Sequence, residues 1–408
     1  MPSPIAEVSH WRQLLVADTT DCRLQSNLAN ALWQCDELAD ALSWVRWAVR
    51  QRGRATWHPL VDRCLGNILL DHGQFAEAEA AYGRSDPASV SPATQFNRSK
   101  AVLGLGDFKR AWHLAEHRLS LEPLPEGVLP GLWWQGWPTV ERATVWFEQG
   151  LGDTLQFVRW LPALLQRVPQ VELRVQRPLQ RLLAEGLGWM GEGLVVVSDA
   201  TTAPDHCHGS LLSLPWLLQQ PQPPWPRPQG YLAIHPAGAP RSAGPGVGPR
   251  RVGVMWGAGR YLESPTRQRD YQRKSLCGTD LETLLQALRC RPLQLFKLQV
   301  GPDGDCPEQA GIAWDGALDP QADFLALAQL LCSLDLVITV DTAAAHLAGA
   351  LGLPTWVLLP WAAASRWGRH TAASPWYPSL RLWRQPRHRD WLGLWPELLS
   401  GLDQELWA

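Results

Sequence analysis

The stretch Asp335–Pro360, DLVITVDTAAAHLAGALGLPTWVLLP, is typical of a strand, a sharp turn, a helix and a second strand. Leu336–Val340 is a continuous apolar, β-branched run of the kind that is buried in a parallel sheet. Strong helix formers follow from Ala343 to Leu351, and Gly352 stands where a left-handed C-cap belongs. A proline two residues later stops the helix before the next apolar run, Thr355–Leu359. The sequence therefore predicts a βαβ unit.

The turn of this unit carries the polar pair Asp341-Thr342, at the position where a helix is capped. The first N–H groups of the helix, beginning at Ala343, point into the crevice in which open parallel sheets bind ligands. A diphosphate is therefore the expected ligand, and His346, one turn along, could reach it. An alternative stays open, in which Asp341 is only an N-cap, Thr342 a first-turn residue, and His346 a buried histidine bonded to a backbone carbonyl.

Length and composition set limits on the class of protein. A chain of 408 residues exceeds what one hydrophobic core organises, so two or three domains are expected. The net charge of −2, without a basic tract, gives no reason to expect a nucleic-acid partner. No apolar run reaches the roughly 18 to 20 residues that span a bilayer, and a signal-peptide pattern is missing, which predicts a cytoplasmic protein. The scattered cysteines indicate reduced thiols, and neither their spacing nor His206-Cys207-His208 predicts a metal site.

Residues 1–120 carry a helical repeat. In the segment LGNILLDHGQFAEAEAAYGRS, small and large apolar residues recur 33 positions later: Gly73 with Gly106, Phe75 with Phe108, Ala78 with Ala111, and Tyr82 with Ala115. A degenerate earlier unit spans Leu28–Val49, with Ala41 and Val45 in the corresponding places. The spacing fits tetratricopeptide (TPR) repeats. Such a short array is either a groove for a peptide or protein segment or a structural cap on the rest of the chain.

Residues 121–218 have the pattern of a first α/β domain. Thr144–Glu148 is an apolar strand, and Gln149-Gly150-Leu151-Gly152-Asp153-Thr154 is a glycine turn into a helix at Leu155–Leu165. Further strands are expected at Val171–Val175 and Leu194–Val197. Residues 219–250 are too rich in proline and glycine for a helix or a central strand, which indicates an interdomain linker.

Residues 251–389 have the pattern of a second α/β domain. Strands are expected at Arg251–Trp256 and Leu293–Leu298, and helices at Leu281–Leu288 and Phe324–Cys332, before the unit quoted above. The amphipathic segment 390–408 is expected to cross back to the first domain. The predicted fold class is thus a helical array followed by two Rossmann-like parallel-sheet domains with a cleft between them.

Three segments resemble a known family. DTAAAHLAGALGLPTWVLLP resembles the donor-binding motif of the ADP-heptose:lipopolysaccharide heptosyltransferase superfamily, and EQGLGDTLQFVRWLP and SPWYPSLRLWRQ resemble relatives fused to TPR arrays. The resemblance covers about residue 131 to the C-terminus. It implies a GT-B fold and an inverting transfer of a sugar from a nucleotide-diphosphate donor, without a metal or cofactor. It also implies that Asp341, Thr342, Ala343 and His346 face the donor.

The acceptor is not set by these motifs. Similar TPR-fused enzymes glycosylate flagellin or other surface proteins, so the resemblance implies a protein acceptor held by the repeats, with a surface glycan as the alternative. A rival of another class is a TPR scaffold whose transferase half binds nucleotide without catalysis.

Asp153 is the first candidate for the catalytic base. It matches the Gly-Asp of the family pattern whose aspartate is the proposed base, and it follows a glycine turn at the end of a strand. Gln149, Gly150 and Gly152 form that turn, on the acceptor side. The alternative is that Asp153 only caps its helix.

Positive charge for the leaving diphosphate is expected from Lys274, in a loop after the first strand of the second domain, or from Arg273 beside it. The alternative for both is a solvated charged loop. Gly257, at the end of that strand, would let the backbone approach a phosphate.

The aromatic segment near the C-terminus leaves two functions open. Arg366, Trp367, Trp376 and Tyr377 either line the pocket for the donor's base or pack the last helices, and packing is the favoured interpretation. The chain departs from its relatives at Ala364-Ser365 and over Gly368–Ala373, where they carry an acidic residue and a longer acidic segment. These departures leave the donor's base and sugar undetermined.

Overall fold

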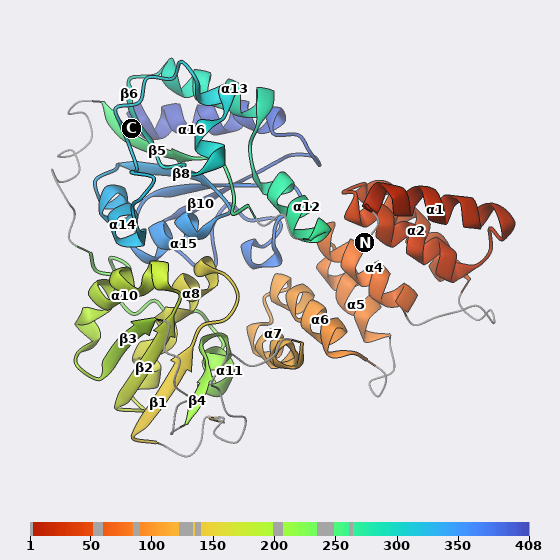
Figure 1. The fold of residues 1–408 in the computed structure, drawn as a ribbon, viewed down its shortest axis with the longest axis horizontal. Helices are drawn as coiled ribbons and strands as arrows, with labels where there is room; N and C mark the ends of the chain where they lie inside the picture. The colour runs from red at the N-terminus through yellow and green to blue at the C-terminus, as the bar shows by residue number, and fades with distance from the viewer. Residues whose placement is uncertain are drawn as a thin grey trace. The chain divides into compact units, whose positions relative to one another are not determined.

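The computed structural model describes residues 3–51, 60–84, 90–121, 134, 140–198, 207–234, 249–260 and 264–407. The chain forms two compact units. The first unit comprises Met1–Pro123, Arg260–Arg273 and Ala362–His370, and the second comprises Leu124–Gly259, Lys274–Trp361 and Thr371–Ala408. The first unit is helical and the second contains two parallel β-sheets, which confirms the predicted order of a helical region followed by two α/β parts (Figure 1).

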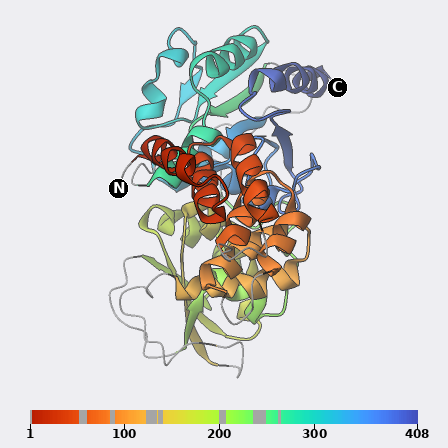
Figure 2. The same ribbon diagram turned by 90° about the vertical axis from the view of Figure 1, so that its right-hand side faces the viewer.

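The first unit is built from successive packed helices, coloured red to orange in Figures 1 and 2. Ser3, Asp21, Ser91 and Asp107 cap helices through their side-chain oxygens, as short polar residues do at such positions. The helices are α1 (Pro4–Ala17), α2 (Cys22–Gln34), α3 (Leu38–Arg50), α4 (Leu60–Asp71), α5 (Phe75–Gly83), α6 (Pro92–Gly104) and α7 (Phe108–Ala115), followed by a 3₁₀ turn at Glu116–Ser120.

The turns inside the pairs α2/α3, α4/α5 and α6/α7 share a backbone feature. Asp36, Gly73 and Gly106 have φ of 66°, 69° and 81°, and each stands two residues before the second helix of its pair. Glycine adopts this left-handed conformation without strain, whereas an aspartate does so at some cost. Gly73 and Gly106, whose equivalence was predicted from their spacing, therefore have the same backbone conformation, and Asp36 has it in the pair α2/α3.

Small residues let the paired helices approach closely. Ala41, Ala78 and Ala111 occupy the fourth position of α3, α5 and α7, and their exposed fractions are 0%, 0% and 1%. A Cβ built on Gly66 of α4 would lie 2.5 Å from the ring of Tyr82, so the tyrosine fills the space that the glycine leaves.

A helix from the middle of the chain, α12 (Pro265–Lys274), belongs to the first unit up to Arg273. Arg273 and Lys274 were predicted to lie in a loop, but they end this helix. Ser264 precedes the proline at the first helical position, and its Oγ accepts from the N–H of Arg267 at 3.2 Å. Serine followed by proline is a recognised helix start, and this signal could have identified α12.

The first sheet of the second unit is parallel, in the order β3-β2-β1-β4. β4 was not predicted, because HGS is too short to show a pattern, and β1 starts two residues before the predicted strand. The strands are β1 (Arg142–Trp146), β2 (Gln170–Val175), β3 (Leu194–Ser198) and β4 (His208–Ser210), with helices α8 (Leu151–Phe157), α9 (Leu161–Leu165), α10 (Gln180–Gly186) and α11 (Leu214–Leu217) and a 3₁₀ turn at Val158–Trp160 between α8 and α9.

The second sheet is also parallel, in the order β10-β9-β8-β5-β6-β7. Its strands are β5 (Arg250–Met255), β6 (Leu293–Lys297), β7 (Gly316–Ala317), β8 (Leu336–Val340), β9 (Thr355–Leu359) and β10 (Leu380–Arg384), with helices α13 (Gly278–Arg289), α14 (Phe324–Cys332), α15 (Ala343–Ala350) and α16 (Trp395–Trp407). The predicted βαβ unit is confirmed, because β8 and β9 have the predicted bounds and Gly352 has φ of 70° after α15.

Both sheets reverse their strand order at one point. In the second sheet β6 and β7 lie on one side of β5, whereas β8, β9 and β10 lie on the other, which is the doubly wound order. The switch point lies between β5 and β8, and in the first sheet it lies between β1 and β4. Ligands of open parallel sheets bind outside the carboxyl ends of the strands at such points, which directs attention to the residues following β1, β5 and β8.

Two predicted connections differ in the structure. The C-terminal segment was expected to cross back to the first domain, but the buried Trp395, Leu398 and Leu402 of α16 belong to the core of the second sheet. Part of the predicted linker is ordered and docked. The N–H groups of Tyr231 and Leu232 donate to the carbonyl of Ala350 at 2.8 and 3.0 Å. Residues 235–248 of that linker lie outside the described residues.

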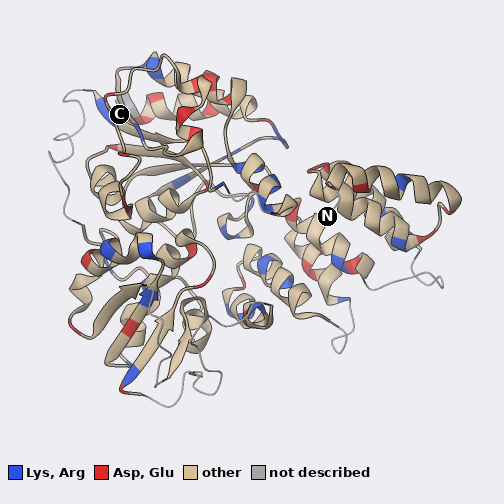
Figure 3. Cartoon of the chain, in the orientation of Figure 1, with Lys and Arg blue, Asp and Glu red and all other residues tan. Residues whose placement is uncertain are grey.

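Over the described part of the chain, no helix has the length and apolar character needed to cross a membrane. Basic and acidic segments are intermixed along the helices and strands of both units (Figure 3).

Candidate functional site

The turn between β8 and α15 is capped by threonine. Thr342 has extended backbone angles, and its Oγ1 accepts from the N–H of Ala344 at 3.2 Å. The cap is therefore Thr342, and the alternative in which Asp341 caps the helix and Thr342 belongs to its first turn is wrong. Because Thr342 has this role, the Asp341 carboxylate is available for another partner.

That partner is Lys274, the last residue of α12. Its Nζ lies 2.9 Å from Oδ2 of Asp341, and the side chains are 31% and 7% exposed, respectively. Asp341 directly precedes the N-cap of α15, so this ion pair lies next to the N-terminus of that helix. The carboxylate offsets part of the lysine's charge, and the positive end of the helix dipole adds to what remains at the switch point of the second sheet.

The neighbouring strand at the switch point is β5. Thr342 Oγ1 lies 3.6 Å from Sδ of Met255, the last residue of β5. Gly257 follows, but its N–H donates to Oε1 of Gln299 at 2.8 Å. A Cβ at Gly257 would lie 3.0 Å from the carboxylate of Asp303 and from Gln299, so a larger residue would require these side chains to shift. Gln299 uses the Gly257 N–H, and approach of this backbone to a phosphate stays a prediction.

The glycine turn after β1 holds Asp153 at the third position of α8. Its Oδ2 accepts from the N–H of Gly150 at 3.1 Å, which is a helix-capping contact. Gln149 is exposed and has φ of 62°, a conformation that costs a non-glycine residue about 1–2 kcal/mol. The capping alternative for Asp153 is thus present in the structure. Strained backbone of this kind occurs at functional turns.

Gly152 brings the two turns together. A Cβ at Gly152 would lie 2.8 Å from Cδ2 of His346, 3.5 Å from its Nε2 and 3.5 Å from Cα of Ala343. Helices α8 and α15 accordingly pack against each other and are adjacent in Figure 1. The first turn of α8, with Asp153, therefore lies against the first turn of α15 within the second unit.

His346 is buried, with 4% of its surface exposed, and its Nδ1 lies 2.8 Å from the hydroxyl of Tyr377. The sequence alternative of a bond to a backbone carbonyl is wrong for this nitrogen. Tyr377 is fully buried, as the packing interpretation predicted, but it also has a polar partner in the site. Tyr231 and Arg159, which complete this network, were missed. An arginine inside the apolar helix pattern after Asp153 was a signal for the latter.

Arg273, which was predicted to contact the diphosphate, instead contacts two aspartates of the helical unit. Its Nη1 donates to Oδ2 of Asp71 at 2.7 Å and its Nε to Asp36, all within the first unit. Its side chain is 6% exposed. A buried guanidinium that pairs with two aspartates is corrected as a candidate for the diphosphate, whereas Lys274, which also pairs with an aspartate, is 31% exposed and remains a candidate.

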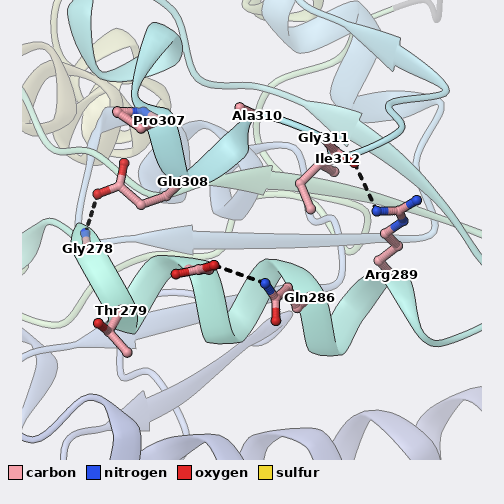
Figure 4. Close-up of a pocket in the computed structure, with 10 residues that line it drawn as sticks. Gly278, Thr279, Gln286, Arg289, Pro307, Glu308, Ala310, Gly311 and Ile312 are labelled. Atoms are coloured by element: carbon pink, nitrogen blue, oxygen red, sulfur yellow. Dashed lines mark hydrogen bonds between the residues drawn. The ribbon is translucent and has the colours of Figure 1, made fainter.

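A hollow of about 480 Å³ lies beside α13, away from these residues (Figure 4). Glu308 accepts from the N–H of Gly278, and Nη1 of Arg289 donates to the carbonyl of Gly311 at 2.9 Å. Glu308 and Arg289 thus bind the backbone, Glu282 accepts from Nε2 of Gln286 at 3.1 Å, and neither Lys274 nor Asp341 lines the hollow. In the described segments, no three side chains of His, Cys, Asp or Glu gather closely enough to hold a metal ion.

The contact at Gly152 makes a stability prediction. Gly152→Ala adds a methyl group 2.8 Å from a buried ring, and we expect it to lower the free energy of unfolding by about 1–3 kcal/mol. Gly188→Ala is the matched control, because no atom lies within 4 Å of its Cβ position and its effect should stay below about 1 kcal/mol. Urea denaturation of both variants measures the difference. Equal midpoints would show that α8 and α15 do not meet at this glycine.

Comparison with known proteins gives remote similarities. No family model matches the sequence. The chain is 27% identical over 366 residues to Protein FlbA of Caulobacter vibrioides, a match that covers 78% of this chain and 57% of that protein. The chain therefore spans little more than half the length of this curated relative.

Solved structures with similarity include the E. coli heptosyltransferase WaaC with ADP, at 12% identity and a TM-score of 0.42, covering 65% of this chain and 99% of that one. The glycosyl transferase family 9 protein from Veillonella parvula is 12% identical with a TM-score of 0.43, covering 65% and 89%. The E. coli ADP-heptose lps heptosyltransferase II is 13% identical with a TM-score of 0.41, covering 65% and 98%.

Proposed function

We propose that this chain is a GT-B glycosyltransferase that moves a sugar from a nucleotide-diphosphate donor to an acceptor hydroxyl. One observation carries the proposal: Gly152 packs against His346 and Ala343, which joins the ends of two parallel sheets at their switch points. A carboxylate, Asp153, lies on one side of that contact, and a lysine with a helix N-terminus lies on the other. Transfer from a diphosphate needs both kinds of group.

The donor side of the proposed site is the first turn of α15. The N–H groups after Thr342 and the ammonium of Lys274 face the diphosphate, which carries the charge that develops as the sugar leaves. Asp341 holds Lys274 in place through their 2.9 Å contact. His346, one turn along, contacts the donor. With this charge supplied by the protein, the transfer proceeds without a metal or cofactor.

The acceptor side is the turn Gln149–Asp153. Asp153 takes the proton of the acceptor hydroxyl with the carboxylate that also accepts from Gly150. A hydroxyl activated on the side of the sugar opposite the diphosphate gives inversion at the anomeric carbon. The proposed inversion therefore depends on the base and the leaving-group site lying on opposite sides of the sugar. Asp153 follows β1 of the first sheet, and Lys274 follows β5 of the second.

The helical unit supports a proposal of TPR repeats. Its three pairs place a left-handed residue and a buried alanine at equivalent positions, although only the pairs α4/α5 and α6/α7 keep the spacing of 33 residues in the sequence. The surface formed by Trp33, Asp36 and Asp71 contacts α12 of the same chain, since Arg269 lies over the Trp33 ring at 4.2 Å. We infer that this surface is a cap on its own chain, so that a protein or surface-glycan acceptor is recruited elsewhere on the repeats. Cytoplasmic location stays a prediction.

One observation favours the rival, a scaffold that binds a nucleotide without catalysis. The Asp153 carboxylate makes the N-terminal capping contact of α8, so its position has a structural explanation. The rival predicts donor binding without turnover.

The experiment that separates the two is a thermal-shift panel of ADP-, GDP-, UDP-, dTDP- and CMP-sugars on the full chain. Any donor that stabilises the protein is then followed for nucleoside diphosphate release, with and without EDTA. We expect a shift with one donor and release that EDTA does not abolish. A shift without release supports the scaffold, and a folded protein that no donor stabilises contradicts both.

Lys274→Met should weaken binding of the stabilising donor about 10- to 100-fold, because a hydrogen bond to a charged group contributes about 1.5–3 kcal/mol. Isothermal titration calorimetry measures the loss, and Lys274→Arg should recover most of it. Lys274→Met also removes a partner of the buried Asp341 carboxylate, which destabilises the fold. The double variant Lys274→Met/Asp341→Asn removes both charges, so it separates an effect on folding from an effect on donor binding. Lys109→Met, on the exposed surface of α7, is the control, and an equal effect there would refute the assignment.

A further inference from the structure

Residues 229–233, which we call the strap, are a part of the predicted linker that is bonded to both α/β halves of the second unit. The N–H of Tyr231 donates to the carbonyl of Ala350, the last residue of α15, at 2.8 Å. The N–H of Ala233 donates to the carbonyl of Gly186, the last residue of α10, at 2.9 Å. The last carbonyls of a helix have no partner within the helix, so the strap satisfies groups that would otherwise need water. Because α10 follows a strand of the first sheet and α15 a strand of the second, the strap joins the two halves.

The strap lies directly against the chain that leaves α15. Gly230 has φ of 103°, and a Cβ built on it would lie 2.5 Å from the carbonyl carbon of Leu351. A Cβ on Gly352 would lie 2.5 Å from the carbonyl oxygen of Gln229. A side chain at either position would collide with backbone, so glycine is needed on both sides of this contact. The linker is therefore docked at this point and does not form a free hinge.

Tyr231 links the strap to the helix that carries Asp153. Its side chain is fully buried, and its hydroxyl donates to the carbonyl of Leu155, in α8, at 2.8 Å. Nη2 of Arg159 donates to the oxygen of the same hydroxyl at 3.0 Å. A carbonyl only accepts and a guanidinium only donates, so one hydroxyl satisfies both bonds. Through its N–H and its hydroxyl, Tyr231 thus connects the end of α15 to the residue two positions after Asp153.

Arg159 makes a second connection between the halves. It lies in the 3₁₀ turn after α8 and is 1% exposed. Its Nε donates to the carbonyl of Gln156 at 2.8 Å, and its Nη1 donates to the carbonyl of Trp376, which precedes β10 of the second sheet, at 2.7 Å. Neither of these acceptors is a carboxylate, and the Tyr231 hydroxyl is not one either. A buried charge costs stability unless an opposite charge offsets it, and in some proteins such groups are retained because they specify one arrangement of the chain.

The contacts between the two halves lie at separate points. Gly152 of α8 packs against His346 in α15, and Tyr231 connects α8 to the opposite end of α15. Arg159 bonds to the segment before β10. A single contact would leave the halves free to rotate about it, whereas contacts at separate points remove that freedom. The two halves therefore have the contacts of one fixed arrangement.

We propose that Tyr231 is a positioning residue, which together with Arg159 holds α8 against α15 in one arrangement before any donor binds. The turn of Asp153 and the donor turn at Thr342 then keep a fixed separation, so turnover needs no closing rotation of the two sheets. The separation matters because a displacement of about 1 Å between reacting groups costs about 100-fold in rate. The effect on turnover rests on the proposed function, whereas the fixed arrangement does not.

Hydrogen–deuterium exchange of the full chain, followed by mass spectrometry, measures this arrangement without a donor. The N–H groups of Tyr231 and Ala233 are bonded to the carbonyls at two helix ends, so they are protected only while the strap is docked. We expect peptides of the strap to exchange as slowly as those of α15. Exchange at the rate of an unstructured linker in the unaltered protein would overturn the proposal.

Tyr231→Phe is the decisive variant, because it removes one hydroxyl and keeps the ring. The Leu155 carbonyl and Nη2 of Arg159 lose their bonds to it, so peptides of the strap and α8 should exchange faster, while those of β5 in the core of the second sheet should not. Arg159→Lys, which keeps the charge and lacks the planar fork, should act in the same direction. Tyr82→Phe is the matched control, since that hydroxyl bonds to Asn67 in the helical unit. Unchanged exchange in the strap and α8 of folded Tyr231→Phe protein would refute the fixed arrangement.

Kinetics with a donor found by thermal shift test the positioning role. Tyr231→Phe should lower kcat about 10- to 100-fold, because Asp153 loses its fixed place relative to the donor. Donor affinity, measured by calorimetry, should change little, since the groups proposed to bind the donor follow β5 and β8 of the second sheet. A general loss of structure would change both quantities, so this difference separates positioning from stability. An unchanged kcat in a variant whose strap exchanges faster would overturn the positioning role. If the unaltered chain turns over no donor, the proposed function fails, and hydrogen exchange still decides the arrangement.

Discussion

Replacing Asp153 with asparagine should lower kcat by about 10²- to 10⁴-fold, the contribution that a general base makes to proton transfer. An amide cannot take the proton of the acceptor hydroxyl, but its oxygen can still accept from the N–H of Gly150, as the carboxylate does at 3.1 Å. The fold and donor binding should therefore change little. Release of nucleoside diphosphate gives kcat, and calorimetry gives the donor affinity.

Asp40→Asn is the matched control for this prediction. Asp40 occupies the third position of α3, as Asp153 does in α8, but it is exposed in the helical unit. Both variants lose a negative charge in the first turn of a helix, worth about 0.3–1 kcal/mol. Only Asp153→Asn should affect turnover. Near-normal turnover in that variant would leave Asp153 as a helix cap and would favour the scaffold.

Replacing Arg273 with methionine should lower the free energy of unfolding by about 3–5 kcal/mol, the cost of breaking a buried ion pair by removing one partner. Arg273 is 6% exposed and bonds to Asp36 and Asp71, which are 11% and 20% exposed. Its loss leaves two largely buried carboxylates without this guanidinium. Chemical denaturation followed by circular dichroism measures the effect on the helical unit.

Arg46→Met is the control, because Arg46 and Glu77 join helices of the same unit at 3.6 Å with side chains 49% and 57% exposed. Such a solvent-exposed pair contributes about 0–1 kcal/mol. The double variant Arg273→Met/Asp71→Leu should be less destabilised than the sum of its single variants, since the charges that it removes are partners. Equal losses from Arg273→Met and Arg46→Met would show that α12 is not anchored by this cluster.

How far the sequence predicts this protein is shown by two segments. The bounds of β8 and β9 were predicted to the residue, because a continuous apolar run between a capping pair and a Gly-Pro stop leaves little choice of structure. The segment QRDYQRKSLCG, with Arg273 and Lys274, was predicted as a loop, but its residues up to Lys274 belong to α12. Charged residues give no apolar periodicity, and only the Ser-Pro start indicated a helix. Pattern is informative where one face of an element is apolar.

The candidate site was predicted in part for the same reason. Asp341, Thr342, Ala343 and His346 follow a buried strand, so their place at its carboxyl end was readable from the pattern. Asp153 and Gly152 were placed by the glycine turn. Arg273 and Gly257 were assigned to phosphate on residue type alone, and their actual partners, Asp71 and Gln299, are remote in sequence.

Local propensity and periodicity along the chain were enough to predict the order of helical array and parallel sheets, the βαβ unit at 335–360 and the residues at its turn. Three contacts could be seen only in the folded chain: Thr342 caps α15, Lys274 pairs with Asp341, and Tyr377 bonds to His346. The physical reason is that a polar side chain is satisfied by whichever donor or acceptor the packing places within about 3 Å, and such partners have no fixed spacing in the sequence.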